Sequence, residues 1–282
     1  MLPIIDTHQH LWDLSKLQTS WMTPGHPLEQ SFTPKEYAEA IAGLNVVKSV
    51  YMEVDVRPDL QQAEADYIIG LCNSGKAPTV AAVVAGRPGD ANFKRYVAQF
   101  QDSRCVKGVR EVIHEGRTPQ GYCLRPEFIR GVQLLGQMGL SFDICIRAGE
   151  LSDAGKLVES CADTRFILDH CGNEPVPKAD HTQWKRDMEA LVKRRNLVCK
   201  VSGIVASAKK GAWKPDDLAP IVNHTLDAFG PDRVMFGGDW PVCTLAATFR
   251  EWVSALKEIV KNRPEEQQRK LFHDNAARFY GI

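Results

Sequence analysis

The sequence lacks the features that mark membrane, nucleic-acid-binding or secreted proteins. None of its 282 residues belong to an apolar run of the roughly 18 residues that predict a transmembrane helix. Lys and Arg together number 35, as do Asp and Glu, so the neutral chain has no electrostatic reason to bind nucleic acid or a membrane. The N-terminus, MLPIIDTHQH, has no basic or long apolar region of a secretory signal. We therefore expect a cytoplasmic protein with a small-molecule partner; nothing in the sequence indicates an oligomeric state.

Closely spaced cysteine pairs are also absent. The chain has eight cysteines but no CxxC pair, which argues against a zinc ribbon. Cys145 in DICIR and Cys199 in LVCKV lie inside apolar runs, where a free cysteine behaves as a small hydrophobic residue. In a reducing compartment we expect all of the cysteines to be reduced and structural.

Short apolar runs alternate with longer segments of helical periodicity along the chain. The runs are rich in Val and Ile and poor in polar residues, which is typical of parallel strands buried on both faces. About eight strand–helix units in one chain of this length predict a single-domain (β/α)8 TIM barrel over 1–282, with an extra C-terminal helix over 264–279. A doubly wound sheet is the alternative, but no GxGxxG follows the first strand. The predicted strands span 4–7, 47–54, 79–85, 106–112, 141–146, 165–169, 197–202 and 233–237. The first predicted helix begins at Pro34, with Thr33 as its N-cap. The other predicted helices between the strands span 59–72, 126–139, 150–161, 182–195, 215–229 and 248–260.

Four polar residues end three of the predicted strands. In a TIM barrel the reactive side chains gather at these carboxyl ends. His8 and His10 end the first strand, and alternate residues of a strand point the same way, so we expect both imidazoles at the barrel mouth. Asp239 ends the last strand and His170 the sixth. Each residue alone is compatible with a structural role, but together they indicate a catalytic site.

Further polar and aromatic side chains are candidates for contacting a substrate. Arg110 on the fourth strand is suited to an oxygen-rich substrate, and a surface ion pair is its alternative role. Tryptophans in the loops could stack on the C–H faces of a sugar ring, or could simply pack the rim. The predicted substrate-binding residues are His114, Glu53, Trp12, Trp240 and Lys200.

Six motifs, in order along nearly the whole chain, resemble the amidohydrolase superfamily. They are DTHQHLW at 6–12, VKGVRE at 106–111, LDHCG at 168–172, CKVSG at 199–203, FGGDWPV at 236–242 and NAARFYG at 275–281. More narrowly, they are similar to its amidohydrolase-related branch of sugar-lactone hydrolases, which includes fuconolactonase- and rhamnonolactonase-like enzymes. The family's usual DHLGKP is DHCGNEP here, and Gly238 replaces the serine of the usual FGSDWP. These departures spare His170 and Asp239 but leave the substrate subclass open.

The resemblance implies a hydrolase that opens a sugar-acid lactone, which is an internal ester. It leaves open whether catalysis requires a metal. Members with two metals need a histidine on strand five, where this chain has Ile146 and Arg147, so a binuclear site is not expected. A single divalent ion, zinc by its ligand types, and metal-free catalysis are both compatible with these residues. The expected metal ligands are His8, His10 and Asp239, with His170 or Glu111 as a further donor.

The resemblance also implies roles in catalysis. We expect Asp239 to be the general base for water and to return the proton to the leaving oxygen. His170, Arg110 or a metal would stabilise the oxyanion. Two other functions stay open: a metal-dependent decarboxylase of an unsaturated or aromatic acid, and a non-catalytic barrel that binds a sugar acid. The decarboxylase would require a tightly bound metal, whereas the binding protein would not need a water-activating carboxylate.

Overall fold

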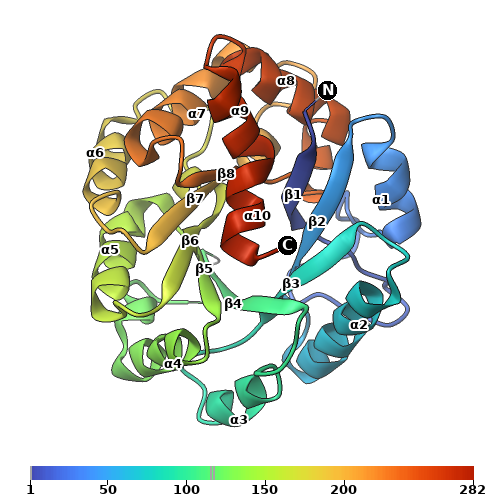
Figure 1. The fold of residues 1–282 in the computed structure, drawn as a ribbon, viewed down its shortest axis with the longest axis vertical. Helices are drawn as coiled ribbons and strands as arrows, with labels where there is room; N and C mark the ends of the chain where they lie inside the picture. The colour runs from blue at the N-terminus through green and yellow to red at the C-terminus, as the bar shows by residue number, and fades with distance from the viewer. Residues whose placement is uncertain (1, 115, 117) are drawn as a thin grey trace.

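A barrel of parallel strands forms the centre of the computed structural model, which describes residues 2–114, 116 and 118–282 (Figure 1). Within these residues eight strands follow one another in sequence order, each hydrogen-bonded to the next. A bridge between Gln9 and Trp240, and a bond of 2.7 Å from the Asp239 N–H to the His8 carbonyl, join the first strand to the chain after the last. The strands are β1 (Ile4–Gln9), β2 (Val46–Met52), β3 (Thr79–Ala85), β4 (Val106–Ile113), β5 (Ser141–Ile146), β6 (Arg165–Leu168), β7 (Leu197–Val201) and β8 (Val234–Phe236).

Helices surround the barrel and alternate with its strands (Figure 1). The predicted (β/α)8 TIM barrel is therefore confirmed, and the doubly wound alternative is wrong. One helix, α3, was not predicted, because its six residues are too few to show a helical period. No helix in the described part of the chain is both long and apolar enough to cross a membrane. The helices are α1 (Pro34–Ile41), α2 (Gln61–Ser74), α3 (Phe93–Ala98), α4 (Pro126–Gln137), α5 (Leu151–Ser160), α6 (Thr182–Leu191), α7 (Pro215–Phe229) and α8 (Phe249–Val260).

Local sequence determines where several of these helices begin. Thr33 caps α1 and forms a reciprocal capping box with Glu36, and Pro34 occupies the first helical position, as predicted. Thr248 and Glu251 form the same box at the start of α8. Such boxes satisfy N–H groups that have no partner inside the helix.

The C-terminal segment closes the end of the barrel that lies opposite the strand carboxyl ends. The sequence predicts one helix over 264–279, but the structure divides it into α9 (Glu265–Arg269) and α10 (Asn275–Tyr280), joined by a π-helical turn. Figure 1 shows α10 lying across the centre of the barrel. Tyr280, which is 3% exposed, packs with Ile5, Val50 and Met235 in a cluster inside the barrel. The C-terminal segment therefore covers this end of the barrel.

The cysteines match their predicted role. All eight are free thiols in the described chain, and only Cys72 is not fully buried. Cys145 and Cys199 lie on β5 and β7, inside the apolar runs that suggested burial.

Candidate active site

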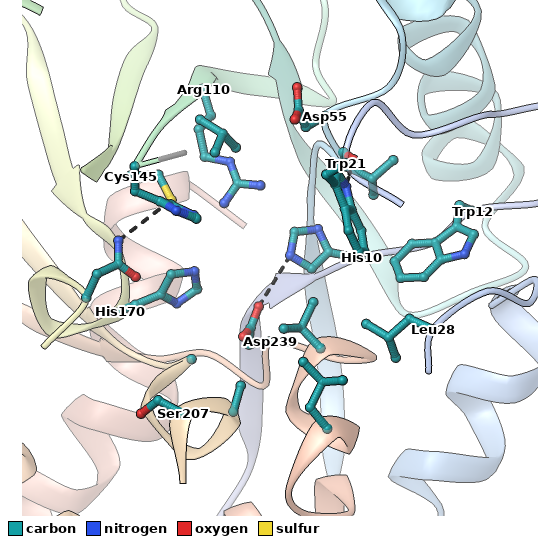
Figure 2. Close-up of a pocket in the computed structure, with 18 of the residues that line it drawn as sticks. His10, Trp12, Trp21, Leu28, Asp55, Arg110, Cys145, His170, Ser207 and Asp239 are labelled. Carbon is teal, nitrogen blue, oxygen red and sulfur yellow. Dashed lines mark hydrogen bonds and ion pairs between the residues drawn. The ribbon is translucent and has the colours of Figure 1, made fainter. Parts of the chain in front are cut away.

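A cavity of about 370 Å³ opens at the carboxyl ends of the strands (Figure 2). This volume is in the range of small-molecule sites. His170, Arg110 and Asp239 lie on one side of it, and an apolar wall from the long β1–α1 loop, with Trp12, lies on the other. The predicted residues that line the cavity are His10, Trp12, Arg110, His114, His170 and Asp239.

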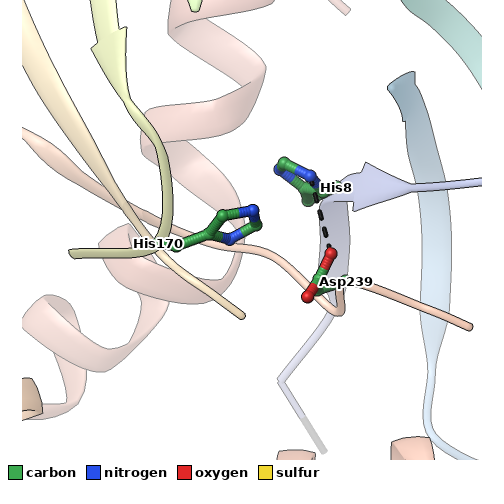
Figure 3. A group of neighbouring side chains, drawn as sticks. All are labelled: His8, His170 and Asp239. Carbon is green, nitrogen blue, oxygen red and sulfur yellow. Dashed lines mark ion pairs between the residues drawn. The ribbon is translucent and has the colours of Figure 1, made fainter. Parts of the chain in front are cut away.

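β1 and the turn after β8 bring His8, His10 and Asp239 together. Asp239 Oδ1 lies 3.3 Å from His10 Nε2 (Figure 2) and 3.6 Å from His8 Nε2 (Figure 3). Gly237 is needed for this approach, because a Cβ there would lie 2.8 Å from the Cβ of His8. Asp239 has a left-handed φ of 53°, a conformation that costs a residue other than glycine about 1–3 kcal/mol and that is concentrated at functional sites.

Both histidines turn Nε2 toward Asp239, and an oxygen acceptor faces Nδ1 of each ring. His10 Nδ1 lies 3.0 Å from the Met52 carbonyl, which only accepts, so Nδ1 carries the proton. His8 Nδ1 faces Asp169 Oδ1 at 3.5 Å, and burial lowers the pKa of His8 well below its usual value, so this ring is neutral. An Arg110 N–H lies 3.3 Å from His8 Nε2 and donates to its lone pair.

This arrangement brings Asp239 Oδ1 within 3.6 Å of an imidazole nitrogen of each histidine, and the ligand atoms of His8, Asp239 and His170 all lie within 4.8 Å of one another. Two imidazole lone pairs and a carboxylate oxygen repel each other unless a cation, either a proton or a metal ion, lies between them. The ligands of a tetrahedral zinc ion, with bonds of about 2.0–2.1 Å, lie about 3.3 Å apart. The measured 3.3 and 3.6 Å separations are close to that spacing. A histidine whose other nitrogen is bonded to a carbonyl or carboxylate is also the usual form of a metal ligand.

His170 comes from the turn Asp169–Gly172 after β6 and faces the same point (Figure 3). A ligand atom of His170 lies within 4.8 Å of ligand atoms of His8 and Asp239. Its Nδ1 is 2.9 Å from Ser202 Oγ, and burial lowers its pKa. Gly203 leaves room for the ring, because a Cβ there would lie 2.2 Å from His170 Nδ1.

Arg110 is held by carboxylates deep in the barrel mouth. Its Nε donates to Glu53 Oε1 at 2.6 Å and its Nη1 to Asp169 Oδ2 at 3.2 Å. The arginine is only 4% exposed, so the alternative of a surface ion pair is wrong. Together with the contact to His8, these bonds make Arg110 a fixed positive charge beside the histidines.

A second buried cation lies below Arg110. Lys200 Nζ is 2.5 Å from Asp143 Oδ2 and 3.2 Å from Asp169 Oδ1, and all three side chains have no exposed surface. Burial raises the pKa of Asp143 to about 7, although Lys200 opposes the increase. Burial also acts to raise the pKa of Asp169, but Lys200 and His8 hold it well below its usual value. Asp169 is therefore a charged link between Lys200, Arg110 and His8.

Three residues predicted to contact substrate lie outside the cavity. Glu53 is 2% exposed and bonds to Arg110 and the Asp55 N–H, and Lys200 has no exposed surface. Trp240 packs its ring 5.3 Å from those of Phe32 and Tyr37, behind the cavity wall. Lys200 and Trp240 therefore lie behind the residues that line this cavity, whereas Glu53 lines a neighbouring cavity.

Glu111, the other predicted metal donor, also lies elsewhere. It accepts from the Tyr122 hydroxyl at 3.1 Å and lines a neighbouring cavity instead of the histidine cluster. It is adjacent to Arg110 on β4, and neighbouring residues of a strand point to opposite faces.

Sequence reasoning missed several residues of the site. Asp169 directly precedes His170 in the LDHCG motif, and this position beside a predicted site residue could have identified it. Its role, however, depends on contacts with other strands. Trp21 and His26 belong to the β1–α1 loop, whose length indicates function. Other residues that line the cavity but were not predicted include Leu28, Asp55, Cys145, Asn173 and Ser207.

Comparisons with known proteins agree with this geometry. A family model described as amidohydrolase matches residues 5–282. An L-fucono-1,5-lactonase from Burkholderia multivorans is 26% identical, covering 99% of this chain and 96% of its own. An L-rhamnono-gamma-lactonase from Scheffersomyces stipitis is 23% identical, covering 99% of this chain and 98% of its own. An amidohydrolase from Burkholderia multivorans, crystallised with bound zinc, has a TM-score of 0.88 and 24% identity over 99% of both chains, a likeness that shows the fold.

Proposed function

Because the chain belongs to the amidohydrolase family, we propose that it hydrolyses the lactone of a sugar acid. The observation that carries the proposal is Asp239, which lines the cavity with one oxygen facing both His8 and His10. Such a carboxylate is suited to taking a proton from water. Full-length similarity to a fuconolactonase and a rhamnonolactonase supports a lactone as the substrate.

Opening a lactone requires an activated water, a polarised carbonyl and a proton for the leaving ring oxygen. Asp239 takes the proton from the water with Oδ2, since Oδ1 faces the histidines, and then returns it to the ring oxygen. His170 Nδ1 lies 2.9 Å from the Ser202 hydroxyl, and in the tautomer that accepts from this hydroxyl, an N–H at Nε2 would serve the oxyanion. Arg110 adds positive charge from the same side of the cavity.

A single divalent ion would be held by His8, His170 and Asp239, whose ligand atoms lie within 4.8 Å of one another, with His10 as a further donor 3.3 Å from Asp239. Zinc suits such a set of imidazoles and a carboxylate. When bound, the ion would act as a Lewis acid on the lactone carbonyl. His8 would exchange its contact with Arg110 for the ion, and Asp169 would continue to hold the Nδ1 side of its ring. Without a metal, the histidines would instead serve as hydrogen-bond donors to the carbonyl.

Changing Asp239 to Asn tests the assignment of the base. The amide keeps the shape of the side chain but cannot take a proton, so kcat for a lactone should fall by about 10²–10⁴. A pH-indicator assay measures the rate, and circular dichroism checks the fold. Asp216→Asn, which makes the same change on a side chain that is 85% exposed, is the matched control and should leave the rate unchanged. A fall smaller than about tenfold in a folded Asp239→Asn protein would exclude Asp239 as the base.

A further inference from the structure

A second cavity, of about 260 Å³, adjoins the first at the barrel mouth. Asp55, Arg110 and Val112 line both cavities. Figure 2 shows Asp55 and Arg110 at the edge of the first cavity, where the two meet. The walls of the second cavity come from the segments that follow β2 and β3 and from β4, so a molecule bound in the first cavity can extend into it.

Glu111 gives the second cavity an unused hydrogen-bond acceptor. Its Oε1 accepts from the Tyr122 hydroxyl at 3.1 Å, while its Oε2 is buried and has no hydrogen-bond partner among the described residues. Burial of an unsatisfied polar atom is unfavourable, so Oε2 would gain a bond from any donor that entered the cavity. Burial also raises the pKa of Glu111 to about 7, which is consistent with poor solvation of this carboxylate.

The charges around the cavity indicate what kind of group it accepts. Arg110 is already bonded to both the side chain and the carbonyl of Glu53, so this pair is neutral overall. The buried Glu111 carboxylate adds a negative group to the lining, and Arg87 Nη1 donates to Gln61 at 2.8 Å. An occupant with a carboxylate would be repelled. A neutral group that both donates and accepts hydrogen bonds, such as a hydroxyl, fits this lining.

We propose that the second cavity is a substrate subsite that holds the hydroxyl-bearing side chain of the lactone. Glu111 accepts a hydrogen bond from one hydroxyl of this side chain. Arg87, which carries the opposite charge, donates a hydrogen bond to a hydroxyl oxygen. The lactone ring then lies at Asp239 in the first cavity, and its carbon chain passes the wall formed by Arg110 and Val112. This inference rests on the proposed lactonase function and extends it to lactones with a polyhydroxylated side chain.

The test compares two lactones of the same ring size, a hexonolactone with its hydroxylated side chain and the unsubstituted ring. In Glu111→Gln the KM for the hexonolactone should rise by about tenfold, the effect of weakening one hydrogen bond to a charged group. The KM for the unsubstituted lactone and both kcat values should stay within about twofold. Arg87→Met should show the same selectivity, and it serves if Glu111→Gln fails to fold. Glu258→Gln, a surface change on α8, should leave both substrates unaffected.

The outcomes separate the subsite from the proposed function. Wild-type turnover of the unsubstituted ring tests the lactonase function alone. Equal changes in KM for both lactones, or no change for either, would overturn the subsite while leaving the function intact. Calorimetric binding of the open-chain hexonate adds a readout that does not need turnover: Glu111→Gln should weaken it by about tenfold, and unchanged affinity would overturn the proposal.

Discussion

Replacing Lys200 with methionine would leave Asp143 without its cation in the interior of the barrel, and Asp169 with Arg110 as its remaining cation. Lys200 Nζ is 2.5 Å from Asp143 and 3.2 Å from Asp169, and none of the three side chains has exposed surface. Removing one partner of a buried ion pair typically costs about 3–5 kcal/mol, because the remaining charge is uncompensated. Since a domain is stable by only about 5–15 kcal/mol, the loss should be a large fraction of the total.

The assay is urea denaturation of Lys200→Met beside a matched control. Lys261→Met removes the same kind of ion pair from the surface: Lys261 and Glu258 are 2.6 Å apart, but their side chains are 57% and 55% exposed. The surface change should have a much smaller effect, because solvent screens this pair. Adding Asp143→Asn to Lys200→Met should recover part of the lost stability, since it removes the carboxylate that Lys200→Met leaves without a cation.

The pH dependence sharpens this test. In Lys200→Met both carboxylates lose the cation that favours their charged form, so their folded pKa values rise. A carboxyl whose folded pKa is raised loses stability as the pH increases, so the defect should be larger at pH 8 than at pH 5. Equal destabilisation by the buried and surface changes would refute the reasoning that burial determines how much each ion pair contributes to stability.

Three further predictions concern the site and its surroundings. Gly203→Ala should destabilise the fold by more than Gly211→Ala and lower kcat by at least about tenfold. Both glycines have a φ near +70°, but only at 203 would the new Cβ meet His170. Equal effects of the two substitutions in melting and kinetic assays would argue against this role for Gly203. His10→Ala should reduce bound zinc, measured by plasma mass spectrometry after dialysis, to less than about a tenth of the wild-type amount. His26→Ala, which changes another histidine of the cavity, should leave the amount of zinc unchanged. Zinc retained by His10→Ala would remove His10 from the set of ligands. Burial raises the pKa of Glu111 from 4.5 to about 7, so the stabilising contribution of its neutral form is lost as the pH rises through that range. In denaturation curves, wild type should lose roughly 2–3 kcal/mol of stability relative to Glu111→Gln between pH 4 and pH 8. A difference in stability that stays constant with pH would contradict the raised pKa.

The sequence was sufficient to predict the barrel and the residues at its mouth that come from strand ends. Periodicity identifies buried strands, and the position of a residue after a strand places His8, His10 and Asp239 at one end. Their mutual distances follow from closure of the barrel between β1 and β8, which the strand order implies.

Contacts between distant strands could not be predicted in the same way. Glu53 and Lys200 carry charge near strand ends, which made them candidates for binding substrate. Whether such a side chain reaches the cavity depends on partners on other strands, and here Arg110 and Asp169 hold both away from it. Pattern alone does not distinguish a charge that binds substrate from one that positions its neighbour.

The division of the last helix was missed for a related reason. The segment from Glu265 to Tyr280 has a helical composition throughout, and no proline or glycine marks the π-helical turn within it. The turn occurs where the chain passes from the barrel surface to its end, so that Tyr280 can pack inside. Tertiary packing, which a single sequence does not display, therefore determines that geometry.

The most direct test of the central claim is hydrolysis of a panel of aldonolactones and muconolactones by the wild-type protein, followed with a pH indicator with and without chelator. The account predicts acid release from at least one aldonolactone, loss of that activity after chelation, and its return with zinc. Activity that survives complete removal of metal would contradict the metal assignment while leaving hydrolysis standing. Hydrolysis of none of the lactones, or release of carbon dioxide from an unsaturated acid instead, would contradict the proposed function itself.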